Sequence, residues 1–332
     1  MILRFAGVCM AVLLAPLSAL YAAPQSYQAP LVSQSLLLDI AQSGSQLVAV
    51  GERGHIILST DGNNWQQVDV PSTSTLTGVY FIDQQGWAVG HDATILHSND
   101  GGQQWHIQNF APSLQRPLLD VLFFDSQHGI AVGAYGTFLR TRDGGQTWLS
   151  ELHEEFLSSD DQQYLNEIRL EDEAFYQQEL GSILPHLNSV SLSGDTLYLA
   201  GEAGLLAFSE DFGAHWQRMD IEYSGSFFNI AKTSSGALVA AGLRGNLFVY
   251  DQLSSTWNAI VSGSNASLNG IISVDNTTTV VLGNNGAIVT LVGDTVTYRQ
   301  VPDGESMING LVFKQHIIAV SVGGIKHLQE GQ

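Results

Sequence analysis

The residues best suited to chemistry in this sequence lie in pairs between two glycines of a short motif that recurs along the chain. The charged, aromatic or amide members of these pairs are Glu52, Arg53, His91, Asp92, Tyr135, Glu202, Arg244 and Asn284. Hydrolysis of a glycoside that carries a carboxylate requires converging arginines, with a tyrosine and an acid as nucleophile and base. Only Arg53 and Arg244 occupy equivalent positions in the motif. We therefore predict no catalytic residue and interpret the pairs as candidate partner contacts, the alternative being solvated turn residues.

The sequence gives no sign of a metal or cofactor site. Its ten histidines are scattered, and no two have metal-ligand spacing on one element. The only cysteine, Cys9, lies in the N-terminal apolar segment, so the mature chain is expected to have neither disulfides nor thiolate ligands. The glycine motif joins two expected strands and opens no helix, unlike a nucleotide-binding loop. We expect no metal and no cofactor.

The glycine motif is also the strongest structural signal. It reads AVGERG (49–54), AVGHDA (88–93), AVGAYG (131–136), LAGEAG (199–204), AAGLRG (240–245) and VLGNNG (281–286), with a shortened copy at 321–325. The steps between first glycines are 39, 43, 68, 41, 41 and 40 residues. Each unit holds four short apolar segments separated by Gly, Asp and Asn turns, which is typical of antiparallel strands. Seven such units predict an all-β, seven-bladed β-propeller of four-stranded blades.

The repeat also predicts how the ring closes. We place the blades at 34–71, 75–113, 117–150, 186–222, 226–263, 267–303 and 307–328. The last unit would need its outer-strand aromatic beyond the end of the chain, whereas Tyr27 lies one period before Trp65. We therefore predict that residues 25–32 form the outer strand of the last blade, which would close the ring and remove an exposed sheet edge.

A second motif, the Asp-box, precedes the fourth strand of several blades. It reads STDGNNW (59–65), SNDGGQQW (98–105), TRDGGQTW (141–148) and SEDFGAHW (209–216). An aspartate in such a tight turn accepts backbone N–H bonds, and the tryptophan packs between blades. We interpret all eight residues as structural: Asp61, Trp65, Asp100, Trp105, Asp143, Trp148, Asp211 and Trp216.

The step of 68 residues indicates an insertion at about 151–185, between blades three and four. Residues 151–180 contain ten acids and one base, Arg169. Ser158 and Ser159 predict a helix start, and a partial apolar face predicts one helix near 160–181. Its apolar residues are Tyr164, Leu165, Ile168, Phe175 and Leu180. The candidate partner-binding acids are Glu154, Glu155, Asp160, Asp161, Glu171, Asp172 and Glu173.

As a connection between blades, this insertion should share a face with the glycine-motif turns. The alternatives are a solvated acidic excursion or a calcium site, although no spaced Asp/Asn loop supports the latter.

The N-terminus predicts export. Arg4, an apolar run over 5–20 and the small residues Ala22 and Ala23 indicate a signal peptide at 1–22, the alternative being a retained membrane anchor. An exported chain without disulfides fits a bacterial periplasm. The remaining 23–332 is expected to form a single propeller, with no direct membrane insertion after cleavage. The net charge of −20 disfavours nucleic acid and anionic membrane surfaces as partners.

The sequence resembles a known family over essentially the whole mature chain, most strongly in the first four blades. LTGVYFIDQQGWAVGHDATILHSNDGGQQW (76–105) and the related residues 118–148 are similar to the photosystem II stability/assembly factor family of seven-bladed propellers. The resemblance implies an exported chaperone that assists assembly of a reaction-centre protein through an arginine-rich surface. Members from non-photosynthetic proteobacteria resemble accessory proteins of resistance-nodulation-division export systems.

This chain departs from that surface, because it has an acidic insertion and few basic residues. We predict a non-enzymatic protein-binding factor whose partner is a membrane-complex subunit with a basic surface. The alternatives are a sialidase-like propeller that binds or hydrolyses glycans, and a purely structural envelope module.

Overall fold

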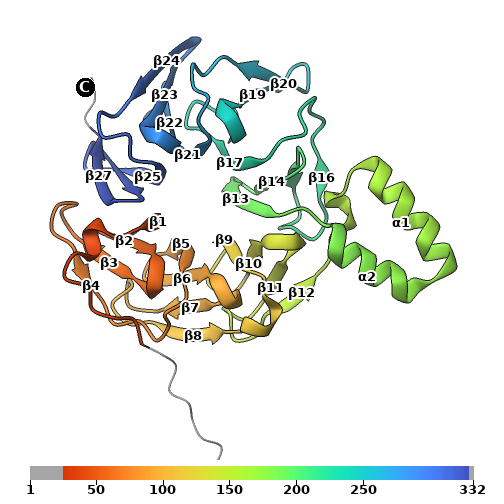
Figure 1. Ribbon diagram of the computed structural model, residues 1–332, viewed down its shortest axis with the longest axis horizontal. Coiled ribbons are helices and arrows are strands. Elements are labelled where there is room, and N and C mark those ends of the chain that lie inside the picture. Colours follow the sequence, from red (N-terminus) through yellow and green to blue (C-terminus); the bar gives the residue numbers. More distant parts are fainter. Residues whose placement is uncertain (1–24, 329–332) are drawn as a thin grey trace, which may run out of the picture.

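The structure is a computed structural model and describes residues 25–328, so the predicted signal peptide lies outside the described residues. Seven antiparallel sheets are arranged as blades around a central channel (Figure 1). In every sheet the strands follow sequence order, from the channel to the rim. The prediction of an all-β, seven-bladed propeller is therefore confirmed.

The strands of the first four blades fall within or close to the predicted boundaries. Blade one contains β1 (Leu37–Ser43), β2 (Gln46–Gly51), β3 (Ile56–Ser59) and β4 (Gln66–Gln67). Blade two contains β5 (Leu76–Ile82), β6 (Gln85–Gly90), β7 (Ile95–Ser98) and β8 (His106–Asn109). Blade three contains β9 (Leu118–Phe123), β10 (Gly129–Gly133), β11 (Phe138–Thr141) and β12 (Leu149–Glu151). Blade four contains β13 (Leu187–Ser193), β14 (Thr196–Gly201), β15 (Leu206–Ser209) and β16 (Gln217–Arg218).

The remaining three blades follow the same order. Blade five contains β17 (Phe227–Lys232), β18 (Leu238–Gly242), β19 (Leu247–Asp251) and β20 (Thr256–Ile260). Blade six contains β21 (Leu268–Ser273), β22 (Thr278–Gly283), β23 (Ala287–Val292) and β24 (Thr295–Gln300). Blade seven contains β25 (Met307–Phe313), β26 (His316–Ser321) and β27 (Gly324–Leu328).

Helical elements are confined to turns, connections and the insertion. The short 3-10 turns are η1 (Val32–Gln34), η2 (Glu52–Gly54), η3 (His91–Ala93), η4 (Pro112–Leu114), η5 (Ala134–Gly136), η6 (Glu154–Phe156), η7 (Leu243–Gly245) and η8 (Asn284–Gly286). The insertion holds the two α-helices, α1 (Ser159–Glu171) and α2 (Glu173–Ile183). Within residues 25–328, no helix combines the length and apolarity that a membrane crossing requires.

Close approach of the chain explains the two glycines of the repeated motif. In blade one, a Cβ on Gly51 would lie 2.1 Å from the carbonyl oxygen of Leu36, in the connection that enters the blade. A Cβ on Gly54, whose φ is +71°, would lie 2.0 Å from the carbonyl oxygen of Ser72, in the connection that leaves it. Only glycine fits both positions, because each connection passes directly against the turn.

The Asp-box carboxylates accept backbone N–H bonds within their own turns. In blade one the Asp61 carboxylate accepts the backbone N–H groups of Asn63 and Asn64, both at 2.8 Å. The indole N–H of Trp65 donates to the carbonyl oxygen of Gly62 at 3.0 Å. Asp100, Asp143 and Asp211 accept backbone N–H bonds in the same way, and Trp105 repeats the bond of Trp65. These bonds satisfy backbone N–H groups of the tight turn, whereas the indole N–H groups of Trp148 and Trp216 are buried without a partner among the described residues.

The predicted closing strand does not form. Residues 25–31 pair with no strand, and blade seven has three strands among the described residues. Instead the backbone N–H of Ser26 donates to the carbonyl oxygen of Val70, and the Gln67 side chain donates to that of Tyr27, each at 2.8 Å. The N-terminal segment therefore hydrogen-bonds to blade one, while Ala29 and Val32 pack in the cluster between blades seven and one. The repeat spacing assigned Tyr27 to the outer strand of blade seven. In the structure its carbonyl oxygen accepts a hydrogen bond from Gln67 of blade one.

Blade seven meets blade one by packing. Leu37, Ile57, Phe313 and Val320 belong to one buried cluster between the two blades. The Asn309 side chain also donates to the Asp39 carboxylate at 2.6 Å. These contacts join the first and last blades without a shared strand.

Deleting residues 25–31 should lower the free energy of unfolding by about 2–4 kcal/mol, since the segment forms five hydrogen bonds with residues 67–70. Its large apolar side chains add little, because Tyr27 and Leu31 are 72% and 63% exposed. Urea denaturation of the mature and shortened chains measures the difference. A loss above about 4 kcal/mol would restore the segment to the role of a closing strand.

The innermost strands share a bulge that lines the channel. In all seven blades the strand register shifts within the first three residues of the inner strand. A cavity of about 120 Å³ lies in the channel, lined by these bulges. Polar side chains from the bulges bond to neighbouring inner strands: Asp39 accepts the N–H of Val79, and Asp120 accepts that of Val190, both at 2.8 Å. The bulges thus cross-link the blades around the channel.

Burial changes the protonation of these two carboxyl groups. Burial raises the pKa of Asp39 to about 6, although hydrogen bonds from Val79, Asn309 and Ile40 act in the opposite direction. Burial, together with the charge of Asp39, raises the pKa of Asp120 to about 7. A carboxyl group removed from bulk water favours its neutral form.

Candidate protein-binding face

The glycine-motif turns all emerge on one face of the ring. Strand direction alternates within each blade, so the turns between second and third strands share a face with the connections between blades. We call this the turn face, defined by residues 52–53, 91–92, 134–135, 202–203, 243–244 and 284–285. The opposite face carries the Asp-boxes.

The second residue of each pair has a left-handed backbone. The φ angles are 56° at Arg53, 60° at Asp92, 54° at Tyr135, 53° at Ala203, 57° at Arg244 and 55° at Asn285. A non-glycine residue in this region costs roughly 1 kcal/mol. The sequence interpretation treated both positions as unconstrained, which is wrong for the second. The turn fixes its backbone, while the side chain remains variable.

Most of the predicted turn residues contact residues of their own blade or of an adjoining connection and do not meet one another across the ring. Arg53 is 74% exposed and lies 3.8 Å from Glu52, a weak surface pair. Asp92 accepts a hydrogen bond from Ser74 at 2.7 Å, while His91 is exposed. Arg244 is exposed in blade five, and Asn284 accepts from Asn269 at 2.8 Å in blade six. These residues contribute to a varied surface around the ring.

Two predicted residues are brought together by one that sequence reasoning missed. The His186 ring packs edge-on against Tyr135, with 4.6 Å between ring centroids, and lies 3.4 Å from the Glu202 carboxylate. Arg116 lies on the other side of Tyr135 and donates to the carbonyl oxygens of Tyr135 and Gly181. The repeat could have suggested His186, because it directly precedes the inner strand of blade four.

The insertion is two helices, whereas the sequence predicted one. Helix α1 begins as expected, with the Ser158 side chain accepting the backbone N–H of Asp161 at 3.2 Å. The break occurs at Asp172, whose carboxylate accepts the N–H groups of Ala174 and Phe175. Asp172 therefore caps a new helix, a role that an apparently continuous acidic stretch concealed.

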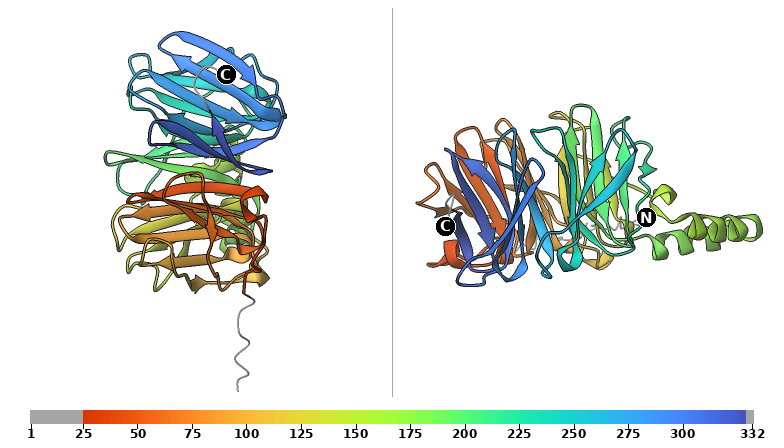
Figure 2. Two further views of the ribbon diagram at one scale, coloured as in Figure 1. Left: turned by 90° about the vertical axis from the view of Figure 1, so that its left-hand side faces the viewer. Right: turned by 90° about the horizontal axis from the view of Figure 1, so that it is seen from above.

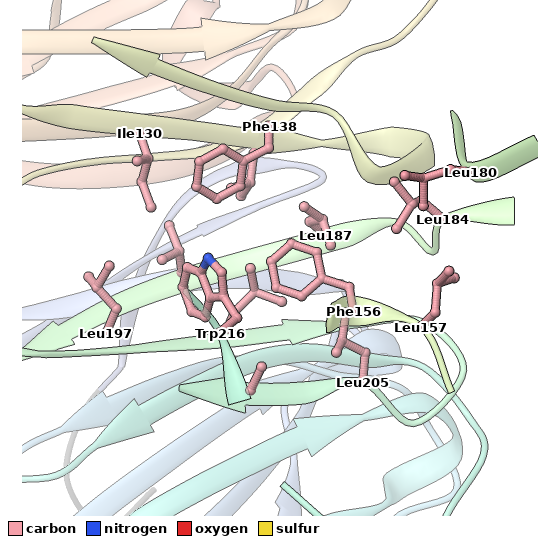
Figure 3. Packing of buried hydrophobic residues seen from close by; sticks show 14 of the residues in the cluster. Ile130, Phe138, Phe156, Leu157, Leu180, Leu184, Leu187, Leu197, Leu205 and Trp216 are labelled. Atoms are coloured by element: carbon pink, nitrogen blue, oxygen red, sulfur yellow. The ribbon is translucent and has the colours of Figure 1, made fainter. Parts of the chain in front are cut away.

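The base of the insertion is part of the hydrophobic core. Phe156, Leu157, Leu165, Tyr176 and Leu180 are buried in one cluster with residues of blades three and four. Figure 3 shows Phe156 beside Trp216, with Phe138 close to both. Of the predicted apolar face, Leu165 and Leu180 are buried, but Tyr164 and Phe175 are 46% and 44% exposed.

The insertion begins at the turn face and then leaves the ring. Leu184 packs against Gly136 of η5, and the backbone N–H of Gly136 donates to Pro185 at 2.9 Å. The helices project sideways from the rim (Figures 1 and 2). The base of the insertion therefore lies on the turn face, as expected, whereas the ends of its helices extend away from the ring.

The predicted acids of the insertion divide into two groups. Glu154 binds Arg169 at 3.0 Å and accepts from the Tyr176 hydroxyl, whose pKa rises to about 12 through burial and this bond. Glu155 pairs with His153, and Asp161 and Asp172 take part in helix starts. The remaining predicted acids, Asp160, Glu171 and Glu173, are exposed on the helices.

A groove joins the insertion to blade four on the turn face. It has a volume of about 750 Å³ and extends from Leu157 and Gln162 to Gly204 and Tyr223. Three carboxylates line it: Glu155, Asp220 and Glu222. The one lining arginine, Arg218, donates to the carbonyl oxygen of Phe156. The groove therefore offers an acidic, partly apolar surface, and sequence reasoning missed Asp220 and Glu222 because they lie in an ordinary connection.

No group of three or more His, Cys, Asp or Glu side chains within residues 25–328 is arranged to hold a metal ion. The turn face is thus a surface of hydrogen-bonding and charged side chains. Such a surface is suited to binding another macromolecule.

Comparison with known proteins identifies the family. The model of the family described as Photosynthesis system II assembly factor YCF48 matches residues 57–117 and 111–305. The chain belongs to the YCF48 family. The sequence resemblance to the photosystem II assembly factors is therefore confirmed.

Individual relatives of the YCF48 family match more locally. The photosystem II assembly protein Ycf48 of Thermosynechococcus vestitus is 42% identical over 50 residues, which cover 15% of this chain and 14% of that protein. The photosystem II assembly lipoprotein Ycf48 of Trichormus variabilis is 40% identical over 55 residues, or 16% of each chain. The aligned segments thus span a small part of these curated relatives.

The fold matches a YCF48 structure over nearly its whole length. The structure described as YCF48 bound to D1 peptide has a TM-score of 0.67 and 17% identity, covering 92% of this chain and 97% of that chain. At this identity the likeness shows the shared propeller fold.

Proposed function

We propose that this chain is a non-enzymatic assembly or accessory factor that binds a subunit of a membrane protein complex. The groove between the insertion and blade four carries the proposal, because its carboxylates outnumber its one arginine, which is engaged with Phe156. Opposite charge across an interface favours encounter and selects the partner. Membership of the YCF48 family supports a role in assembly, and a partner peptide accompanies one structure of that family.

We propose that the contact surface combines this groove with the turn face and the exposed acids of the helices. Its members would include Tyr135, Glu202, Asp160, Glu171 and Glu173. The partner would present lysines and arginines to this surface. We further propose that the protein is exported and acts in the periplasm, which the N-terminal sequence and the lipoprotein name of one relative support.

A pair of matched triple variants tests this proposal. Asp160→Asn/Asp220→Asn/Glu222→Gln neutralises exposed acids at the groove and insertion. Asp195→Asn/Glu210→Gln/Asp294→Asn neutralises three exposed acids in turns of the opposite face. The tagged proteins would capture complexes from detergent-solubilised native membranes, and mass spectrometry would identify the captured subunits as reaction-centre or transport-system proteins.

We expect the first variant to capture at least about fivefold less of a membrane subunit than the wild type, and the second to match the wild type. Capture by the wild type should also fall when the salt concentration rises from about 0.05 to 0.5 M. Equal capture by both variants, or capture that does not respond to salt, would exclude the acidic groove as the binding surface. A full deletion of the insertion is unsuitable, because it would remove buried core residues.

A further inference from the structure

Blade seven offers a sheet edge that the other blades have covered. Among the described residues it contains β25, β26 and β27, whereas each other blade has a fourth strand on the rim. The strand β27 (Gly324–Leu328) pairs with one strand of the described residues, β26. At its start the carbonyl oxygen of Ser33 in η1 lies against Gly324, so the uncovered part of the edge is the part that ends at Leu328. An unpaired strand edge presents backbone N–H and C=O groups that another extended segment can bind.

The hydrogen-bonding groups of this edge can be assigned. Ser321 pairs with Gly324 across a two-residue turn, and pairing continues to Ile317 and Leu328. Inter-strand bonds in an antiparallel pair alternate along the strands, and the residues that flank a two-residue turn form a bonded pair. The N–H and C=O groups of Ile325 and His327 consequently face away from β26.

Blade seven has a groove near this edge, where its described residues include no equivalent of the aromatic residue found in the other blades. The six complete blades each carry an aromatic residue near the start of the fourth strand: Trp65, Trp105, Trp148, Trp216, Trp257 and Tyr298. Trp105, for example, packs in a cluster with residues of blades one and two. In blade seven a groove of about 770 Å³ is lined by Val274, Val312, Ile317 and Leu328, which belong to the cluster between blades six and seven.

Three basic side chains gather at this groove, in a chain whose net charge is −20 with histidines counted as neutral. Lys314, His316 and His327 line it, together with one acid, Asp61. The Lys314 ammonium group also donates to the carbonyl oxygen of Thr60 at 2.9 Å. The Asp61 carboxylate already accepts four hydrogen bonds within its Asp-box, from Asn63, Asn64 and Ser59. The groove therefore complements an acidic segment.

We propose that β27 is a strand-addition site for an extended segment of a partner protein, which carries an aromatic side chain flanked by carboxylates. The segment becomes the fourth strand of blade seven, its aromatic ring fills the groove, and its carboxylates meet Lys314 and His316. Backbone pairing supplies affinity and the side-chain groove supplies specificity. This site lies at the rim of blade seven, on the Asp-box side, and is separate from the acidic turn-face groove.

A synthetic peptide provides the probe. It carries residues 254–262 of this chain, SSTWNAIVS, which include the fourth strand of blade five, with two aspartates added at each end. Fluorescence polarisation measures its binding to the mature protein. Control peptides replace the tryptophan with serine or the aspartates with lysines, and both should bind at least about fivefold more weakly.

The matched protein variants are His327→Pro and His327→Ala. Proline removes the outward N–H without breaking the β26 pairing and is tolerated on an edge strand, so the peptide should bind at least about tenfold more weakly. Alanine keeps that N–H and should change the affinity by less than about threefold. Circular dichroism and thermal melting report whether each variant remains folded.

Three results would overturn the proposal. The first is no saturable binding of the peptide to the wild-type protein. The second is equal binding to a folded His327→Pro variant. The third is quantitative disulfide formation in a Gln28→Cys/Ile325→Cys variant, which would assign this edge to the chain's own N-terminal segment.

Discussion

Replacing Phe156 with alanine lowers the free energy of unfolding by about 3–5 kcal/mol, the range for loss of a buried aromatic side chain. Phe156 is fully buried, and its ring lies 5.4 Å from that of Trp216 and 6.5 Å from that of Phe138. It joins the start of the insertion to the interface of blades three and four. Its removal leaves a cavity that the surrounding strands cannot fill. Urea denaturation of the mature chain measures the loss.

The control for this experiment is Leu170→Ala on the same insertion. Leu170 is 88% exposed, so its truncation should change stability by less than about 0.5 kcal/mol. Similar losses in the two variants would mean that the insertion does not pack against the ring as described.

The channel carboxyl groups should make the protein less stable as pH rises from about 4 to 7. Asp39 and Asp120 have folded-state pKa values raised to about 6 and about 7, against 3.8 for the free group. The folded state then binds protons more tightly than the unfolded state. Stability is therefore fully present below pH 3.8 and is lost as pH rises through the folded values. We expect these two groups to contribute a decrease of about 1–3 kcal/mol over this range.

An Asp39→Asn/Asp120→Asn variant isolates this contribution. Other groups act in both proteins: burial lowers the pKa of His55 and His97, which opposes the effect below about pH 6.5. The difference in unfolding free energy between wild type and variant should therefore change steadily from about pH 4 to 7, in favour of the variant at higher pH. A difference that is independent of pH would show that the two carboxyl groups titrate normally in the folded chain.

The blades could be predicted because each repeats the same local rules. Glycines, apolar segments and Asp-boxes recur at nearly constant spacing, and every copy reinforces the same boundaries. The closing strand could not be predicted, because polar contacts of Gln67 and Asp69 with the N-terminal segment decide its position. The channel bulges were not predicted. A signal for them was present, because Leu-Leu-Asp occurs at equivalent places in two blades, 37–39 and 118–120.

The position of the insertion was predicted, but its two helices were not. The long repeat step located the insertion, and Ser158 located its start. The second helix start at Asp172 depends on a backbone change that an acidic sequence does not reveal. The sequence alone did not suggest three residues near the insertion: Asp220, Glu222 and His186. Their connections lie beside the insertion only in the folded chain. Tyr176 was missed because its partners, Glu154 and Arg169, are distant in sequence.

Site-specific photocrosslinking in native membranes tests the central claim most directly. A benzophenone amino acid would replace Tyr135 on the turn face, Phe175 on the insertion, or Phe212 on the opposite face, each of them 44–49% exposed. The proposed function predicts crosslinks to one integral membrane subunit from the first two positions and none to it from Phe212. Crosslinks to that subunit from Phe212 alone would contradict it.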